Sequence, residues 1–178
     1  MRVTSKVDYA VRACLELAAR YDSLPDRGGQ WVKADDVAAA QSISLSNVLS
    51  ILSELKRAEL VKSRRGADGG YRLAYRPADI VIADIVRAID GPLANIAGRH
   101  VEDASYEGAA APLRDVWVAL RAAMRTVLDE VTLADLASNH LPARVRELVA
   151  DDEAWTTRPH GRNTRVSGVR SQVPGSPN

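Results

Sequence analysis

The chain has 178 residues, of which 26% are charged and 46% are hydrophobic, a mixture typical of a globular protein with a core of its own. Its 24 Lys and Arg residues nearly balance its 23 Asp and Glu residues, which excludes a uniformly basic protein but not a local basic patch. The single cysteine, Cys14, excludes an intrachain disulfide and any site held mainly by thiolates of one chain.

Neither a secretion signal nor a membrane span is expected. Charged side chains from Lys6 onward interrupt the N-terminal apolar residues. The longest charge-free run, Val37 to Ser53, is 17 residues long and contains five serines, so it is too short and too polar to cross a bilayer. We therefore expect a cytoplasmic protein.

The first predicted element is a helix over Thr4–Ala19, which Thr4 or Ser5 can cap. Its apolar residues recur at the spacing of one helix face: Val7, Val11, Cys14, Leu15 and Ala18. Cys14 is on this stripe, which favours a small core residue over a reactive thiol.

Two short helices follow, after a loop at Leu24–Gln30 and a candidate strand at Trp31–Val32. They are expected at Lys33–Gln41 and from a Ser44 cap to about Ala58. The apolar face of the second is Leu45, Val48, Ile51, Leu52 and Leu55. The pair is a candidate helix-turn-helix, with an ordinary helical hairpin as the alternative.

A glycine-rich hairpin is predicted next, with strands at Leu60–Arg64 and Tyr71–Leu73 around a turn at Gly66–Gly70. A helix-turn-helix followed by such a hairpin has the layout of a winged helix. The stretch is strongly basic, with Lys56, Arg57, Lys62, Arg64, Arg65, Arg72 and Arg76 against Glu59 and Asp68. This concentration indicates an anionic partner, nucleic acid first, with a solvated charged face as the alternative.

The second half contains a predicted helix at Ile80–Ile89, an aperiodic region at Gly98–Pro112 and a long helix at Leu113–Val131. A heptad seam runs along the long helix: Leu113, Trp117, Leu120, Met124, Val127 and Val131. We expect this seam to pair with a second chain, rather than to pack on its own domain. The predicted organisation is a DNA-binding domain over 1–78, linker and dimerisation helices over 79–150, and a disordered tail over 151–178.

The hairpin carries a specific resemblance. Ser63–Leu73 follows the pattern Ser, two residues, Gly, two residues, Gly-Gly-Tyr, one residue, Leu, which resembles the wing of the Rrf2-type winged-helix transcription regulators. Supporting matches are Lys6–Ala10, Ile43–Ser46 and Asp84–Gly91. The resemblance covers the chain to about Leu136. It implies a mostly α fold with a small β-wing and a long dimerisation helix, in a homodimer that binds operator DNA near promoters.

The sequence departs from this family in two places. Cluster-binding members carry three cysteines in the loop before the long helix, and the loop here has none, although the carboxylate at Asp8, which contributes to the cluster in some relatives, is retained. The spacing of the loop's potential metal ligands, His100, Glu102, Asp103 and Glu107, supports no particular metal site and favours a solvated loop. We therefore expect no metal and no cofactor. Leu49 replaces a glutamate that related regulators use to read bases, so the operator sequence of those regulators cannot be carried over to this chain.

The predicted DNA contacts come from the second helix of the motif and from the wing. Small polar residues at a helix N-terminus approach bases and phosphates, and Asn47 could read adenine. Leu49 could touch a thymine methyl or pack under the wing. Wing glycines allow positive φ and close approach to phosphate, and wing arginines suit a narrow minor groove. The predicted contacts are Ser44, Ser46, Asn47, Leu49, Ser50, Lys62, Arg64, Arg65, Gly66, Gly69, Gly70, Tyr71 and Arg72.

The sequence shows no enzyme motif, since its three histidines are scattered and no nucleophile elbow or dinucleotide fingerprint occurs. It predicts a homodimeric repressor without an iron–sulfur cluster. The effector stays open between a small molecule, held between the winged helix and the long helix, and a protein partner, as in cluster-free relatives that are controlled through a cysteine-biosynthesis enzyme. A dimeric interaction module without DNA function is the remaining alternative.

Overall fold

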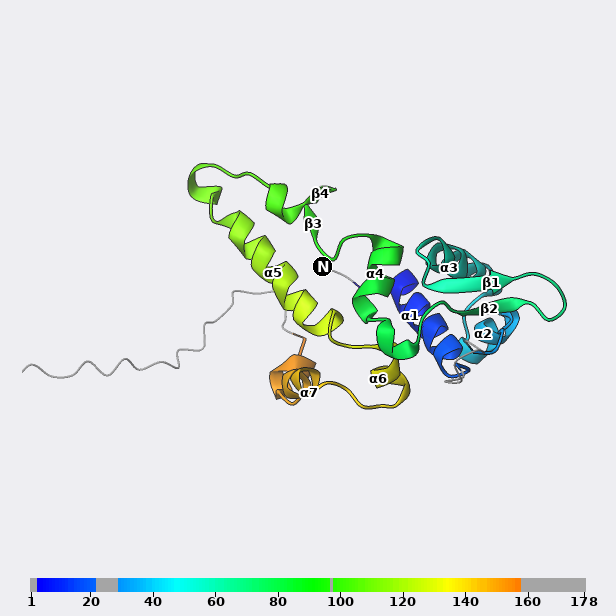
Figure 1. Cartoon of the computed structure of the whole chain (residues 1–178). Helices are drawn as coiled ribbons and strands as arrows, with labels where there is room; N and C mark the ends of the chain where they lie inside the picture. The colour runs from blue at the N-terminus through cyan, green and yellow to red at the C-terminus, as the bar shows by residue number, and fades with distance from the viewer. Residues whose placement is uncertain (1–2, 22–28, 97, 158–178) are drawn as a thin grey trace, which may run out of the picture.

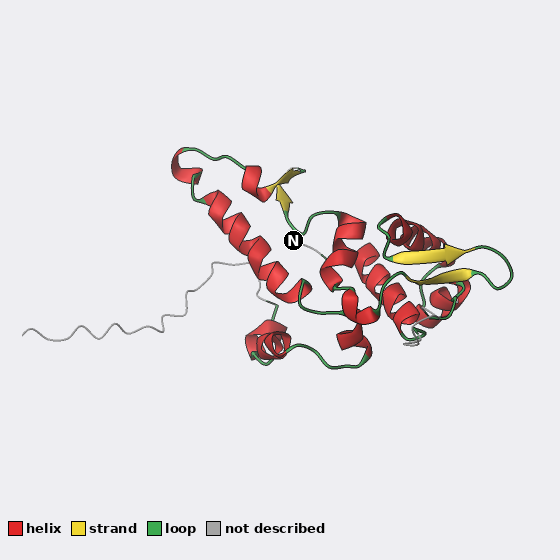
Figure 2. Ribbon diagram, viewed as in Figure 1, coloured by secondary structure: helices red, strands yellow, loops and turns green. Residues whose placement is uncertain are grey.

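The computed structural model of the chain describes residues 3–21, 29–96 and 98–157. Helices dominate it (Figure 2). A helix-turn-helix and a β-hairpin lie at one end, the long helix α5 lies towards the other, and α1 and α4 lie between them (Figure 1). This architecture confirms the predicted class, mostly α with a small β-wing and a long helix.

Helix α1 spans Ser5–Ala18, one residue shorter at each end than predicted. Its cap is Thr4, whose side chain accepts a hydrogen bond from the Val7 amide at 3.2 Å. Cys14 is fully buried, which confirms that the apolar stripe faces the core. Burial raises the pKa of its thiol to about 12, because a thiolate would lose its hydration there.

The helix-turn-helix consists of α2, Ala34–Gln41, and α3, Leu45–Arg57. Ser42 makes the tight connection in the left-handed conformation, with φ 53°, and Ile43 is buried behind it. Ser44 caps α3 as predicted. Four of the five predicted apolar residues of α3 are buried, but Leu45 is 39% exposed because it lies in the first turn, beyond the core.

The wing is an antiparallel hairpin of β1, Val61–Arg64, and β2, Gly70–Leu73. Val61 pairs with Leu73 and both are buried, which places this face of the hairpin on the core. The predicted strand at Trp31–Val32 is a single bridge, in which Val32 and Tyr71 exchange two backbone hydrogen bonds of 2.9 and 2.8 Å. Much of the predicted loop before it, residues 22–28, lies outside the described residues.

After the wing come a 3₁₀ turn, Pro77–Asp79, and helix α4, Ile82–Asp90. The region expected to lack regular structure contains a small hairpin of β3, Asn95–Ile96, and β4, Arg99–His100, then 3₁₀ turns at Val101–Asp103 and Gly108–Ala110. Buried Val101 and an ion pair from Glu102 to Arg121 of α5 hold this region in place. The Glu102 backbone amide and Arg121 lower the pKa of the Glu102 carboxyl.

Helix α5 spans Leu113–Leu128 and ends three residues before the predicted end. Val131 therefore lies beyond it, where its carbonyl accepts a 2.9 Å hydrogen bond from the Ile82 amide and its side chain is buried. The short helix α6, Leu133–Ala137, has the predicted Thr132 cap. Helix α7, Ala143–Val149, was not predicted, and a 3₁₀ turn, Asp152–Trp155, occupies the start of the predicted tail. Residues 158–178 of that tail lie outside the described residues.

One hydrophobic core joins α1, α2, α3 and the wing. It does not stop at the predicted boundary after Ala78, because Ile80, Ile85 of α4 and Leu133 of α6 are buried in the same cluster. Helices α4 and α6 therefore complete the winged helix. No helix within the described ranges combines the length and apolarity that a membrane crossing needs.

Candidate nucleic-acid interface

The N-terminal part of α3 presents polar side chains to solvent. The Ser44 hydroxyl accepts a hydrogen bond from the backbone amide of Asn47 at 3.4 Å and lies 3.2 Å from the Ser46 hydroxyl. Asn47, Leu49 and Ser50 are all exposed. At 42% exposure, Leu49 is not packed under the wing, and its contact with a thymine methyl stays a prediction. All five predicted contact residues of α3 are therefore accessible to a partner.

The wing has an outer face that is strongly cationic. Lys62 pairs with Arg72 and Arg64 pairs with Gly70 in the hairpin register, so strand alternation places the three cations on one face, opposite buried Val61 and Leu73. We call Lys62, Arg64 and Arg72, together with neighbouring Trp31, the outer wing face. Arg65 follows β1 at the tip of the wing and is exposed.

Trp31 contacts both arginines of this face. The Cζ atom of Arg72 lies 4.6 Å from the centroid of the Trp31 ring, and the Cζ atom of Arg64 lies 5.0 Å from it. Arg64 also donates from Nε to the Asp68 carbonyl at 3.2 Å, across the turn. Sequence reasoning did not include Trp31 in the site, and the one signal for it was an aromatic residue in a candidate strand before an arginine-bearing hairpin.

Tyr71, which was predicted as a DNA contact, faces the inner side of the wing. It is paired with Ser63 and with Val32, and its half-buried ring packs against the hydrophobic core. Its ring therefore stabilises the inner side of the wing.

The wing positions that carry glycine need it for different structural reasons. Gly66 and Gly70 adopt positive φ, 105° and 150°, as predicted, but Gly69 does not. A Cβ atom on Gly69 would lie 2.3 Å from the Arg64 carbonyl oxygen, and one on Gly70 would lie 2.5 Å from the Val32 carbonyl oxygen. These two glycines thus permit close contacts within the wing itself, a reason that the sequence did not indicate, and their close approach to phosphate stays a prediction.

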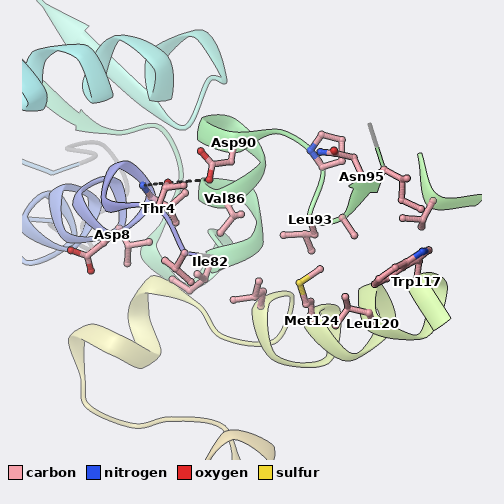
Figure 3. A pocket seen from close by; sticks show the side chains of 18 of the residues that line it. Thr4, Asp8, Ile82, Val86, Asp90, Leu93, Asn95, Trp117, Leu120 and Met124 are labelled. Atoms are coloured by element: carbon pink, nitrogen blue, oxygen red, sulfur yellow. Dashed lines mark hydrogen bonds between the residues drawn. The ribbon is translucent and has the colours of Figure 1, made fainter. Parts of the chain in front are cut away.

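An apolar groove of about 900 Å³ separates the winged helix from α5. Val86 of α4 and Leu93 face it from one side, and Leu120 and Met124 of α5 face it from the other (Figure 3). Of the predicted seam, Leu113, Trp117, Leu120 and Met124 line the groove, whereas neither Val127 nor Val131 belongs to its lining. The seam is therefore directed, over most of its length, into this space.

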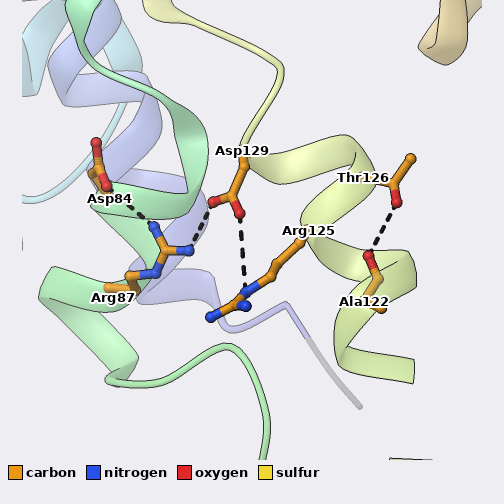
Figure 4. A network of polar contacts seen from close by, with 6 residues as sticks. All are labelled: Asp84, Arg87, Ala122, Arg125, Thr126 and Asp129. Atoms are coloured by element: carbon orange, nitrogen blue, oxygen red, sulfur yellow. Dashed lines mark hydrogen bonds and ion pairs between the residues drawn. The ribbon is translucent and has the colours of Figure 1, made fainter. Parts of the chain in front are cut away.

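A polar network fixes α5 against α4 beside the groove. Arg87 of α4 donates to Asp84 at 3.1 Å and to Asp129, directly after α5, at 2.7 Å, and Arg125 approaches Asp129 at 4.0 Å (Figure 4). Exposed ion pairs of this kind contribute little stability singly. Here they link the end of α5 to the element that completes the winged-helix core.

Comparison with known proteins decides the family. The Rrf2 family model, described as an iron-dependent transcriptional regulator, matches residues 3–139. The chain belongs to the Rrf2 family. It is 45% identical over 161 residues to Rv1287 of Mycobacterium tuberculosis H37Rv, which is named a candidate HTH-type transcriptional regulator, and the match covers 90% of this chain and 96% of that one. This confirms the family resemblance and makes the chain a DNA-binding transcriptional regulator by family.

Solved structures of Rrf2 proteins share the fold. CymR, the global cysteine regulator of Bacillus subtilis, superimposes with a TM-score of 0.62 at 32% identity, over 78% of this chain and 98% of that one. IscR from T. potens superimposes with a TM-score of 0.59 at 28% identity, over 89% and 94% of the two chains. Rrf2 regulators bind DNA and are commonly dimeric, and no enzymatic activity is indicated by these relatives.

The iron dependence in the Rrf2 description can be tested against the side chains present. Protein-bound iron–sulfur clusters are held mainly by thiolates, and the one thiol here, that of Cys14, is fully buried with a raised pKa. Asp8 is exposed on the same helix and pairs with Arg12 at 3.4 Å, away from Cys14. Across the described ranges, no three His, Cys, Asp or Glu side chains are grouped as metal ligands. These residues do not fit an iron–sulfur cluster.

Proposed function

We propose that this Rrf2 chain is a homodimeric, sequence-specific DNA-binding repressor whose DNA binding needs no iron–sulfur cluster. The observation that carries the proposal is the exposed polar start of α3 beside the cationic wing, at the end of the molecule remote from α5 (Figure 1). A dimer bound near a promoter occupies DNA that polymerase needs, which favours repression.

In this proposal, α3 enters the major groove and the wing contacts the backbone. Asn47 is exposed in the first turn of α3, where its amide could form the paired hydrogen bonds that adenine offers. Exposed Leu49 suits contact with a thymine methyl group. Arg65 at the wing tip supplies a charge for phosphate or for a narrow minor groove. The base contacts would set sequence preference, and the wing cations would supply salt-dependent affinity.

Assembly as a homodimer is supported by α5. Leu120 on the predicted seam is 39% exposed and Val116, one turn before it, is 54% exposed. Together with the groove-lining Trp117, they leave a large apolar surface accessible to solvent, which is unusual unless another molecule covers it. A second copy of α5 is the proposed cover. Two α3 helices related by a two-fold axis then require a roughly palindromic operator.

Selection of binding sequences from a random duplex library tests the proposal. We expect the selected DNA to be enriched in inverted repeats whose half-sites are about one helical turn apart. A reporter carrying the selected sequence at its promoter should be less active when the protein is present. The Asn47→Ala variant, as a control, should select a different consensus. A library that stays random after repeated rounds would contradict sequence-specific binding.

The effector has two candidates. The apolar groove lies where a small molecule could be held between the winged helix and α5, and nearby polar groups include the Thr4 hydroxyl, which donates to Asp90 at 3.0 Å. The similarity to CymR, a global cysteine regulator, favours a second candidate function, regulation of cysteine or sulfur metabolism. In this candidate the proposed effector is a protein partner. A thermal-shift screen with sulfur metabolites and divalent metals distinguishes the two, because a small effector raises the melting temperature directly.

The absence of a cluster requirement gives a sharp expectation. Protein purified without oxygen should be colourless, with iron and sulfide far below one per chain, and a chelator should leave its DNA affinity unchanged. The Cys14→Ala variant should bind DNA as the wild type does, since the buried thiol contacts only the core. A brown protein with near-stoichiometric iron and sulfide, whose DNA affinity falls when the cluster is removed, would show that the proposal is wrong.

A further inference from the structure

Trp31 lies outside the hairpin in sequence but beside it in space. Its neighbour Val32 exchanges backbone hydrogen bonds of 2.9 and 2.8 Å with Tyr71 of β2, so the segment before α2 runs alongside the hairpin. Because Val32 is buried and successive residues of an extended chain alternate, Trp31 lies on the outer side with the cations of β1 and β2.

The outer wing face brings three positive charges together. Lys62 is directly opposite Arg72, an arrangement of like charges that destabilises an antiparallel pair, and Arg64 is two residues further along the same face. The face of an indole ring is electron-rich and attracts guanidinium groups. The Trp31 ring, within 4.6 Å of Arg72 Cζ and 5.0 Å of Arg64 Cζ, offsets the repulsion between these side chains.

We propose that Trp31 is the positioning residue of the wing: it orients Arg64 and Arg72 for contact with DNA phosphates. A guanidinium that lies over a ring keeps its N–H donors at its edge. Arg64 uses Nε and Nη2 on the Asp68 carbonyl, so its other edge is the one that can reach a phosphate oxygen. A stacked guanidinium also loses less rotamer freedom on binding than an unstacked side chain. This inference rests on the proposed DNA binding and adds a residue that precedes both the helix-turn-helix and the hairpin.

The test compares Trp31→Leu and Trp31→Phe with the wild type in binding a fluorescent 30-base-pair duplex of arbitrary sequence at several salt concentrations. We expect Trp31→Leu to bind about five- to tenfold more weakly, with a smaller reduction for Trp31→Phe, which keeps an aromatic face. The slope of log affinity against log salt should fall by about 0.9 for each phosphate that the variant no longer neutralises. Circular dichroism verifies that both variants are folded.

Two further measurements separate positioning from a merely structural role. In an Arg64→Gln/Arg72→Gln background, Trp31→Leu should have no additional effect on affinity, because its effect passes through the two arginines. Binding of the duplex should change the tryptophan fluorescence of the wild type but not of Trp31→Phe. Trp155→Leu, a matched change at a 75% exposed residue after α7, should leave affinity unchanged.

The outcomes are distinct. If the wild type does not bind duplex DNA at all, the proposed function is wrong and this inference falls with it. If the wild type binds and Trp31→Leu binds with equal affinity and equal salt slope, only the role of Trp31 is overturned. The role of Trp31 is also overturned if Trp31→Leu abolishes the binding that remains in the Arg64→Gln/Arg72→Gln background, because Trp31 would then act through the fold of the wing.

Discussion

Replacement of Arg64, Arg65 and Arg72 by alanine should weaken DNA binding by about 1,000-fold or more, because it removes three charge-assisted hydrogen-bonding groups at about 1.5 kcal/mol or more each. The effect should also appear in the salt dependence. Since each phosphate neutralised by the protein adds about 0.9 to the slope of log affinity against log salt, that slope should become shallower by up to about 2.7. Fluorescence anisotropy with labelled duplex at four or more salt concentrations measures both quantities.

A control with the same change in net charge separates direct phosphate binding from general electrostatics. Arg99, Arg144 and Arg146 are exposed in β4 and α7, away from the wing, and their triple alanine variant should alter the slope little. Asn47→Ala should change sequence preference more than the salt slope, since it removes a group that reads a base. An unchanged slope in the wing variant would exclude the wing as a DNA-binding element.

Substitution of Leu120 or Trp117 by aspartate should convert the protein into a monomer. A charge in a desolvated interface without a partner costs several kcal/mol, of the order of 3–5 kcal/mol. Light scattering at micromolar concentration should then give the mass of one chain, 19.3 kDa. Affinity for the selected operator should collapse as well, because a monomer can bind only one half-site.

Val118→Asp is the matched control for this experiment. Val118 is 36% exposed on α5 but lies off the seam, so an aspartate there adds the same charge without entering the proposed interface. It should remain dimeric. The interpretation of the seam is wrong if wild-type protein is monomeric at micromolar concentration and still binds its operator tightly.

The winged helix could be predicted because local signals agree there. Ser44 marks the start of α3, the apolar spacing of α3 matches one buried face, and glycines mark the turn between two short strands. The charges of the wing are also local, since strand alternation alone places Lys62 and Arg64 on one face. Such features depend on neighbours within a few residues.

The features that sequence reasoning missed depend on residues far apart in the chain. Trp31 meets Arg72 only because Val32 pairs with Tyr71, some 40 positions later. Val131 continues the heptad spacing of α5, yet its backbone bonds to Ile82, so the apolar period persists beyond the end of the helix. The need for glycine at position 69 could not be predicted either, because the Arg64 carbonyl oxygen that a Cβ atom would meet comes close only in the folded turn.

The buried cysteine is a built-in probe of local opening of the core. Each chain has one thiol, that of Cys14. While the core is closed, a reagent cannot reach this thiol, and its raised pKa keeps it from forming the reactive thiolate. A thiol-specific reagent therefore modifies only molecules in which α1 has separated from its neighbours, and the rate of modification reports how often that happens. Helix α1 packs against both α3 and α4. The rate of modification, measured with and without DNA, therefore shows how much DNA binding at α3 and the wing suppresses the opening of α1.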